Sequence, residues 1–197
     1  MSNGHIHNWH ILIMGLWQEA SEPVGLLRLF GQILEMPEAN QIGTRVEIRP
    51  HDADFSKFAE KIHLLSGPDP KVYIYCYSWG GGHGAFGRKG LARELGKRGI
   101  EVELVIACDI VYHGWPGFRW IQWRVPYKKI TIPANVKSVW PWFVQQEDYP
   151  RGHDLVAEDP ASTIISTAIV LHRGHKYMDE APQFWKAVLD NIERTGQ

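Results

Sequence analysis

The chain has 197 residues, enough for one domain with a buried core, and we expect a single domain over residues 1–197. Its fractions of charged residues (22%) and hydrophobic residues (44%) are typical of a globular protein. A formal net charge of −1 without a block of basic residues disfavours nucleic-acid binding, and the lack of a stretch of about 18 apolar residues predicts no membrane span.

The first apolar run has no Lys or Arg before it, unlike a secretory signal, so we expect a cytoplasmic protein. Short runs that are apolar or alternating predict strands at 10–14, 44–48, 72–77, 101–108, 135–144 and 162–171. Apolar residues at helical spacing predict helices at 23–36, 55–65, 88–97 and 181–193. The GPDP sequence at 67–70 should separate the second helix from the third strand.

This alternation of strands and helices predicts an α/β fold: a mainly parallel central sheet of about six strands with helices on both faces. Cys76 and Cys108 lie inside apolar runs, which predicts buried, reduced thiols. No cysteine pair has a metal-binding spacing such as C-x-x-C, and we expect neither a metal nor a cofactor.

The third predicted strand ends at Ser78, and glycines follow it. The pattern C-Y-S-W-G, from Cys76 to Gly80, is close to G-x-S-x-G, in which a serine stands on a sharp strand-to-helix turn. Cys76 replaces the first glycine, and Gly80 meets the second. Such a turn exposes the serine hydroxyl and aims the next helix N-terminus at developing negative charge, so the backbone N–H of Trp79 is a candidate oxyanion donor.

The same stretch has a competing interpretation. Gly82, Gly84 and Gly87 spell G-x-G-x-x-G, a pattern typical of dinucleotide binding, and Asp109 follows at a distance suited to a ribose contact. In that motif the first glycine comes directly at the strand end, whereas here Trp79–Gly81 intervene. We therefore favour the serine turn and keep nucleotide binding as an alternative.

A nucleophilic serine needs a base, since its hydroxyl is barely ionised at neutral pH. His175 follows the last predicted strand and precedes the final helix, a position where such sheets assemble sites. His172 is the second choice because it lies nearer the strand end, and His153 is the third.

The base also needs an orienting acid. Asp109 comes directly after the strand that follows the serine strand, and sequential strands in such sheets are usually neighbours. We therefore expect Asp109 at the same sheet edge as Ser78. Glu147 and Asp148, after the next predicted strand, are the alternatives.

Three segments resemble the α/β-hydrolase superfamily, especially its small, capless lipase- and esterase-like members. YCYSWGGG (75–82) resembles the nucleophile turn, and ELVIACDIV (103–111) resembles the strand that precedes the acid. GHKYMDEAP (174–182) resembles the closing segment around the family's catalytic histidine. The resemblance extends from the first strand to the last helix.

The resemblance implies Ser78 as the nucleophile, His175 as the general base and acid, and Asp109 as the orienting acid. The loop after the first strand, MGLWQE, resembles the family's oxyanion loop, so Leu16 or Trp17 would supply the second backbone donor.

An aromatic segment broken by prolines, residues 112–127, lies just beyond Asp109. If Asp109 is in the site, this segment should form an acyl- or aryl-binding wall or a short lid; its filling of the core is an equal alternative. The candidate pocket residues are Trp115, Phe118, Trp120 and Trp123.

The sequence thus predicts a serine hydrolase of carboxylic esters, acting on a small ester through an acyl-enzyme. Two alternatives remain: a degenerate, non-catalytic relative that uses the scaffold for binding, and a nucleotide-binding module built on the Gly82-Gly84-Gly87 turn.

Overall fold

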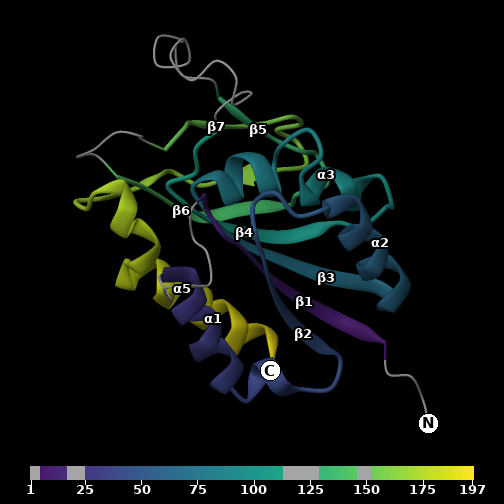
Figure 1. Ribbon diagram of the computed structural model, residues 1–197. Helices are drawn as coiled ribbons and strands as arrows, with labels where there is room; N and C mark the ends of the chain where they lie inside the picture. Colours follow the sequence, from purple (N-terminus) through teal and green to yellow (C-terminus); the bar gives the residue numbers. More distant parts are fainter. Residues whose placement is uncertain (1–4, 17–24, 113–128, 146–151) are drawn as a thin grey trace.

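The computed structural model describes residues 5–16, 25–112, 129–145 and 152–197 (Figure 1). Within these ranges a central parallel sheet has the strand order β2-β1-β3-β4-β6-β8, and β9 also pairs with β6. Its strands are β1 (Ile6–Ile13), β2 (Thr44–Arg49), β3 (Ser66–Tyr77), β4 (Val102–Cys108), β6 (Ser138–Gln145), β8 (Ile164–Ile165) and β9 (Ile169–Leu171). The predicted α/β fold with a mainly parallel sheet is confirmed.

Helices cover both faces of the sheet (Figure 1). One face packs against α1 (Gly25–Glu35) and α5 (Pro182–Thr195), and the other against α2 (Phe55–Leu65) and α3 (Leu91–Gly96). The other elements of the described ranges are the 3-10 helices η1 (Glu38–Asn40) and η4 (His175–Glu180), the π-helical turn η2 (Gly80–Ala85), and a small parallel sheet of β5 (Ile130–Ile132) and β7 (Leu155–Ala157).

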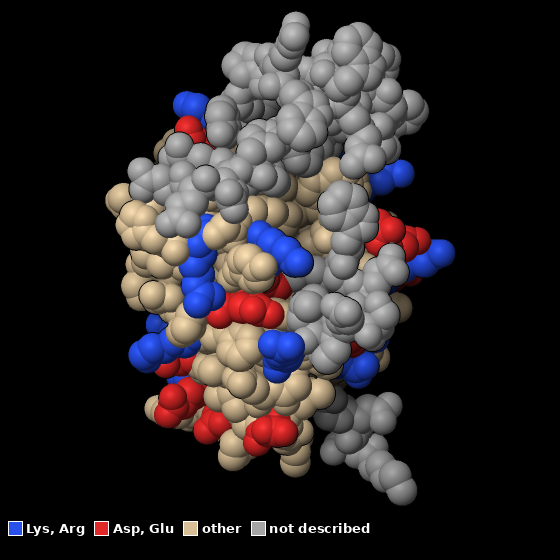
Figure 2. All heavy atoms as spheres, turned by 60° about the vertical axis from the view of Figure 1, so that its left-hand side comes forward, with Lys and Arg blue, Asp and Glu red and all other residues tan. Residues whose placement is uncertain are grey.

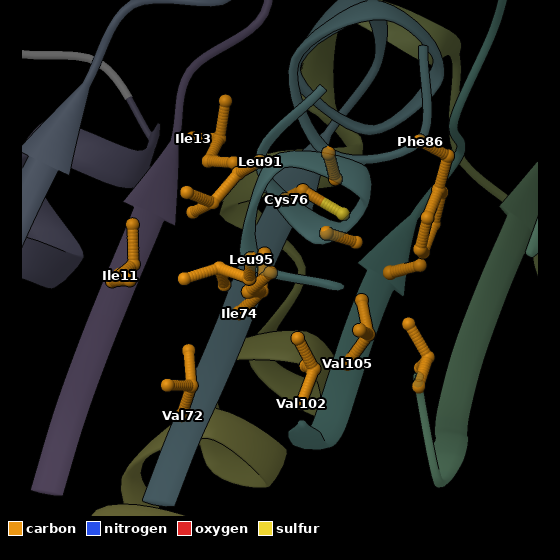
Figure 3. Packing of buried hydrophobic residues seen from close by; sticks show 14 of the residues in the cluster. Ile11, Ile13, Val72, Ile74, Cys76, Phe86, Leu91, Leu95, Val102 and Val105 are labelled. Carbon is orange, nitrogen blue, oxygen red and sulfur yellow. The ribbon is translucent and has the colours of Figure 1, made fainter. Parts of the chain in front are cut away.

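The side chains of the VYIYCY segment of β3 alternate between the two faces of the sheet. Successive side chains of a strand point to opposite sides. Val72, Ile74 and Cys76 join the core under α2 and α3, and Figure 3 shows them on the same side of the strand as Leu91 and Leu95. The three intervening tyrosines join the core under α1 and α5. Each buried tyrosine hydroxyl on that side needs a hydrogen-bond partner.

Two predictions differ from the structure at segments that contain or face a proline. The predicted strand at 162–171 is two short strands, β8 and β9, which gives the described sheet seven strands instead of six. These strands pair with β6 on either side of Pro141, which has no N–H to donate. The GPDP sequence at 67–70 does not precede β3 but lies within it, where the pairing with β1 shifts register between Ser66 and Lys71.

The predicted helix at 88–97 is also shorter than expected. The chain after Ser78 first forms η2, then a turn, and α3 begins only at Leu91. Gly90, just before α3, has an extended backbone conformation. The glycine-rich stretch therefore forms a separate compact turn that sets the start of the helix.

A buried polar network joins β1, β3 and α5. Asn191 accepts a hydrogen bond from Arg194 through its Oδ1 and donates to the hydroxyl of Tyr75 through its Nδ2 (2.8 Å). The hydroxyl proton of Tyr75 then points to Nδ1 of His10, 2.8 Å away. His10 is therefore neutral, with its proton on Nε2 near Thr195 Oγ1. Burial lowers the pKa of His10 from 6.5 to about 4.

This network predicts a loss of stability in mild acid. The folded chain keeps His10 neutral down to about pH 4, whereas the unfolded chain protonates it near pH 6.5. Above pH 6.5 the neutral His10 makes its full contribution to the free energy of unfolding. About 3 kcal/mol of that free energy is lost as the pH falls toward 4. The free energy of unfolding, measured with urea across this range, should depend less steeply on pH for His10→Gln than for the wild type. Equal slopes in the two proteins would contradict the assignment.

No helix in the described ranges is long and apolar enough to cross a membrane. Acidic and basic side chains are interspersed on the face of the molecule in Figure 2, which agrees with the near-zero formal net charge. Charged side chains also form ion pairs, such as Lys61 and Arg45 with Glu47 on β2. The described surface on this face therefore carries no uniform charge.

Candidate active site

The candidate site lies at the carboxyl edge of the central sheet. β3 and β4 are parallel neighbours, paired up to Tyr77 and Cys108, so Ser78 and Asp109 follow adjacent strand ends. His175 begins η4, shortly after β9. The parallel topology therefore brings three distant parts of the chain to one edge.

The three side chains form a continuous hydrogen-bonded chain. Ser78 Oγ lies 2.9 Å from His175 Nε2, and His175 Nδ1 lies 2.5 Å from Asp109 Oδ2. A carboxylate can only accept, so the imidazole proton is on Nδ1 and Nε2 accepts the hydrogen bond of the serine hydroxyl. Of the three predicted histidines, His175 is the one in contact with Ser78. His172 is exposed after β9, and the backbone N–H of His153 donates to Ile110.

Ser78 stands on a turn with an unusual backbone conformation. Its φ is +52°, in the left-handed region that non-glycine residues rarely adopt. Its N–H donates to the carbonyl of Cys108, and its carbonyl accepts from Gly81, Gly82 and Val111 at 3.1–3.3 Å. These four hydrogen bonds hold the strained residue in place, a situation typical of functional sites.

The glycines after Ser78 are explained by close approach of the chain to itself. A Cβ at Gly80 would overlap the carbonyl oxygen of Ile13 at the end of β1. A Cβ at Gly82 would overlap the carbonyl oxygen of Val111, after β4. η2 is therefore wedged between the ends of β1 and β4. A Cβ at Gly84 or Gly87 would likewise overlap the side chain of Ile13 or the carbonyl oxygen of His83, so close packing accounts for the glycines of the G-x-G-x-x-G pattern.

The cysteine that replaces the first glycine of the motif fits for the same reason. Cys76 is fully buried, and a Cβ at Gly81 would overlap the side chain of Ile110 and lie 3.2 Å from the sulfur of Cys76. Gly81 thus leaves space for the side chain of Ile110, with Cys76 beside it. Burial raises the pKa of Cys76, so its thiol stays neutral and acts as part of the core.

Asp109 is fully buried, and both of its carboxylate oxygens have partners. Oδ1 accepts hydrogen bonds from the backbone N–H groups of Gln145 (3.0 Å) and Gly152 (2.9 Å), while Oδ2 faces His175. Its φ of +43° and a 2.7 Å hydrogen bond from its N–H to Phe143 fix the backbone. These donors satisfy the buried group and set its orientation. The alternative acids, Glu147 and Asp148, lie outside the described residues.

Tyr77 supports His175, a role that the sequence did not suggest. Its hydroxyl donates a 2.6 Å hydrogen bond to the backbone carbonyl of His175, and its ring stacks on the imidazole at 5.2 Å between centroids. Burial raises the pKa of Tyr77, so the hydroxyl remains a donor. The alternation of β3 places Tyr77 on the face of α5 and η4, but it does not show which group the hydroxyl meets there. The thiol of Cys108 adds a second link, to the carbonyl of Met178 in η4.

The loop after β1 comes up to the serine. A Cβ at Gly15 would lie 3.0 Å from the Cβ of Ser78, so the backbone here approaches the site closely. Burial lowers the pKa of His51, whose imidazole is hydrogen-bonded to the backbone of Gly15 and meets the ring of Trp79 edge-on at 5.5 Å between centroids. His51 therefore links the loop after β1 to the turn after Ser78, a second support that the sequence analysis missed.

The predicted oxyanion and pocket residues are described only in part. Leu16 ends the described part of the loop after β1, and Trp79 begins the turn after Ser78. The other predicted residues lie outside the described ranges: Trp17, Trp115, Phe118, Trp120 and Trp123.

None of the protein-family models and none of the curated proteins compared with the chain matches it. The geometry of the site therefore provides the chemical argument. A serine hydroxyl directed at an imidazole, whose other nitrogen is held by a buried carboxylate, is an arrangement that can generate an alkoxide-like nucleophile near neutral pH. Among the described residues, no group of three or more potential metal ligands lies close together.

Proposed function

We propose that the protein is a serine hydrolase of carboxylic esters. The observation that carries this proposal is the chain of contacts from Ser78 through His175 to Asp109, at 2.9 and 2.5 Å, on a turn with a positive φ. Nucleophile, base and orienting acid meet the distances that acyl transfer requires. The resemblance of the three segments to the α/β-hydrolase superfamily supports the same chemistry.

In the first half-reaction, Ser78 Oγ attacks the ester carbonyl carbon while His175 Nε2 takes the hydroxyl proton. Asp109 stabilises the imidazolium through Nδ1–H. The tetrahedral oxyanion is placed near the N-terminus of η2, where the N–H of Trp79 and an N–H from Leu16 or Trp17 would be its donors. Collapse breaks the C–O bond to the alcohol, which leaves with the proton from His175.

In the second half-reaction, water attacks the acyl-enzyme. His175 takes a proton from that water and then returns one to Ser78 Oγ as the carboxylic acid leaves. The proposed substrate is a small ester, with the aromatic segment around Trp115, Phe118, Trp120 and Trp123 as the wall for its acyl or aryl group.

A fluorophosphonate probe tests this proposal directly, since it reacts with activated serines. The wild-type protein should be labelled at Ser78, as located by peptide mass spectrometry, and Ser78→Ala should not be labelled. Ser162→Ala, which removes an exposed hydroxyl elsewhere, should be labelled like the wild type. Labelling that persists in Ser78→Ala would show that another residue reacts.

The non-catalytic alternative predicts that no histidine lies within hydrogen-bond reach of Ser78. The 2.9 Å contact with His175 contradicts that expectation. One measurement still distinguishes the two proposals: the non-catalytic alternative predicts no turnover of short p-nitrophenyl esters, whereas the esterase proposal predicts turnover.

A further inference from the structure

A cleft of about 290 Å³ lies on the α3 side of the sheet, between η2 and β5. Its walls include three cationic side chains, Arg88, Arg93 and Lys129, and the backbone of Gly82 and Gly87. The hydroxyl-bearing Thr131 adds a further polar group. The esterase mechanism assigns no task to these cations.

The charges of the cleft are not balanced within the described residues. Arg93 pairs with Glu158 at 3.3 Å. Arg88 and Lys129 are exposed, and neither forms an ion pair with a carboxylate in the ranges that the structure describes. Counting these four groups, the cleft has a charge of +2 (three cations and one carboxylate). Like charges around a concave surface raise the potential within it and attract an anion.

The remaining wall is apolar. Phe86 and Ile130 are buried, and Tyr112 is half-buried. Ligand sites commonly combine such walls with a few polar groups that fix orientation. An anion with a small aromatic or apolar body matches this combination better than a free inorganic ion. The cleft volume limits that body to roughly the size of one ring with its substituents.

We propose that this cleft binds a small phosphate monoester with an aromatic body. A phosphate monoester carries about two negative charges near neutral pH, which matches the charge of the cleft. The guanidinium groups of Arg88 and Arg93 suit phosphate because their parallel N–H donors match its oxygens. The phosphate lies toward the cations, and the ring lies against Phe86, Tyr112 and Ile130.

The cleft adjoins the candidate active site but does not depend on it. The N–H of Gly82 donates to the carbonyl of Ser78, and Tyr112 lies three residues after Asp109. A ligand in the cleft would therefore contact the outer side of the turn that holds Ser78. Its binding requires no turnover, so it can be tested whether or not the esterase proposal holds.

Isothermal titration calorimetry with phenyl phosphate tests the proposal on the full chain. The double variant Arg88→Gln/Lys129→Gln should bind about five- to thirtyfold more weakly, which corresponds to roughly 1–2 kcal/mol for the two exposed charges together. Lys89→Gln removes a neighbouring exposed cation that does not line the cleft, and it should change the affinity less than about twofold. Ser78→Ala should bind like the wild type, which separates this cleft from the candidate active site.

Three ligand controls define the chemistry. Phenol lacks the charge and inorganic phosphate lacks the ring, so both should bind more weakly than phenyl phosphate. Benzoate carries only one negative charge, so its affinity should also be lower than that of phenyl phosphate. The proposal is overturned if phenyl phosphate does not bind at millimolar concentration, if benzoate binds equally well, or if Lys89→Gln weakens binding as much as the double variant. Loss of binding in Ser78→Ala would also overturn it, because the ligand would then occupy the serine site.

Discussion

Replacing Asp109 with asparagine is expected to lower kcat for p-nitrophenyl acetate by about 10³–10⁴-fold. The asparagine Oδ1 can still accept hydrogen bonds from the N–H groups of Gln145 and Gly152. Its NH₂ group then faces His175 Nδ1 and donates to it, which moves the imidazole proton to Nε2. In that tautomer His175 can no longer accept the proton of Ser78.

The fold of this variant should be preserved, because asparagine has the shape of aspartate and tolerates a positive φ. Thermal unfolding should therefore change little while kcat falls. Asp159→Asn is the matched control, since Asp159 also accepts a backbone N–H, from Ala161, but lies far along the chain on an exposed turn. It should keep full activity. A loss smaller than about tenfold in Asp109→Asn would transfer the acid role to Glu147 or Asp148.

The second large effect concerns stability. Gly80→Ala is expected to lower the free energy of unfolding by about 3 kcal/mol or more, because the added methyl group overlaps backbone carbonyl oxygens at the end of β1. The nearest of them belongs to Ile13, the last residue of a central strand, and cannot move without disturbing the pairing of that strand with β2 and β3. The midpoint of thermal unfolding should fall by about 6 °C or more.

Gly31→Ala is the control for this variant. Gly31 is an exposed glycine within α1, and a Cβ there meets nothing within 4 Å. Alanine at this position should raise the free energy of unfolding by about 0.5–1 kcal/mol through its higher helix propensity. A Gly80→Ala protein as stable as the wild type would show that η2 is not wedged between β1 and β4 as described.

The sequence predicted much of the fold because its strongest signals were local. Apolar and alternating runs identified β1, β2, β3, β4 and β6, though not the short β5, and the serine and aspartate followed two of these strands directly. Parallel topology then placed Ser78 and Asp109 at the same edge. His175 could be selected by its position after the last strand, and the structure places it against Ser78.

The parts that sequence reasoning missed depend on contacts between distant segments. The hydrogen bond from Tyr77 to the carbonyl of His175 joins residues 98 positions apart. The link from His51 to the loop after β1 and to Trp79 also joins separate segments of the chain. The split of the last predicted strand depends on Pro141, which lies in its pairing partner. No local pattern at these positions predicts such contacts.

Both residues that flank His175 in the hydrogen-bonded chain have left-handed backbones, with φ of +52° at Ser78 and +43° at Asp109. Each such conformation costs of order 1 kcal/mol for a residue with a Cβ, a penalty that glycine would avoid. At Ser78 glycine would relieve this strain, whereas at Asp109 it would leave the buried N–H groups of Gln145 and Gly152 without their acceptor. A stabilised laboratory variant with glycine at position 78 would therefore have lost the proposed nucleophile in exchange for a less strained backbone.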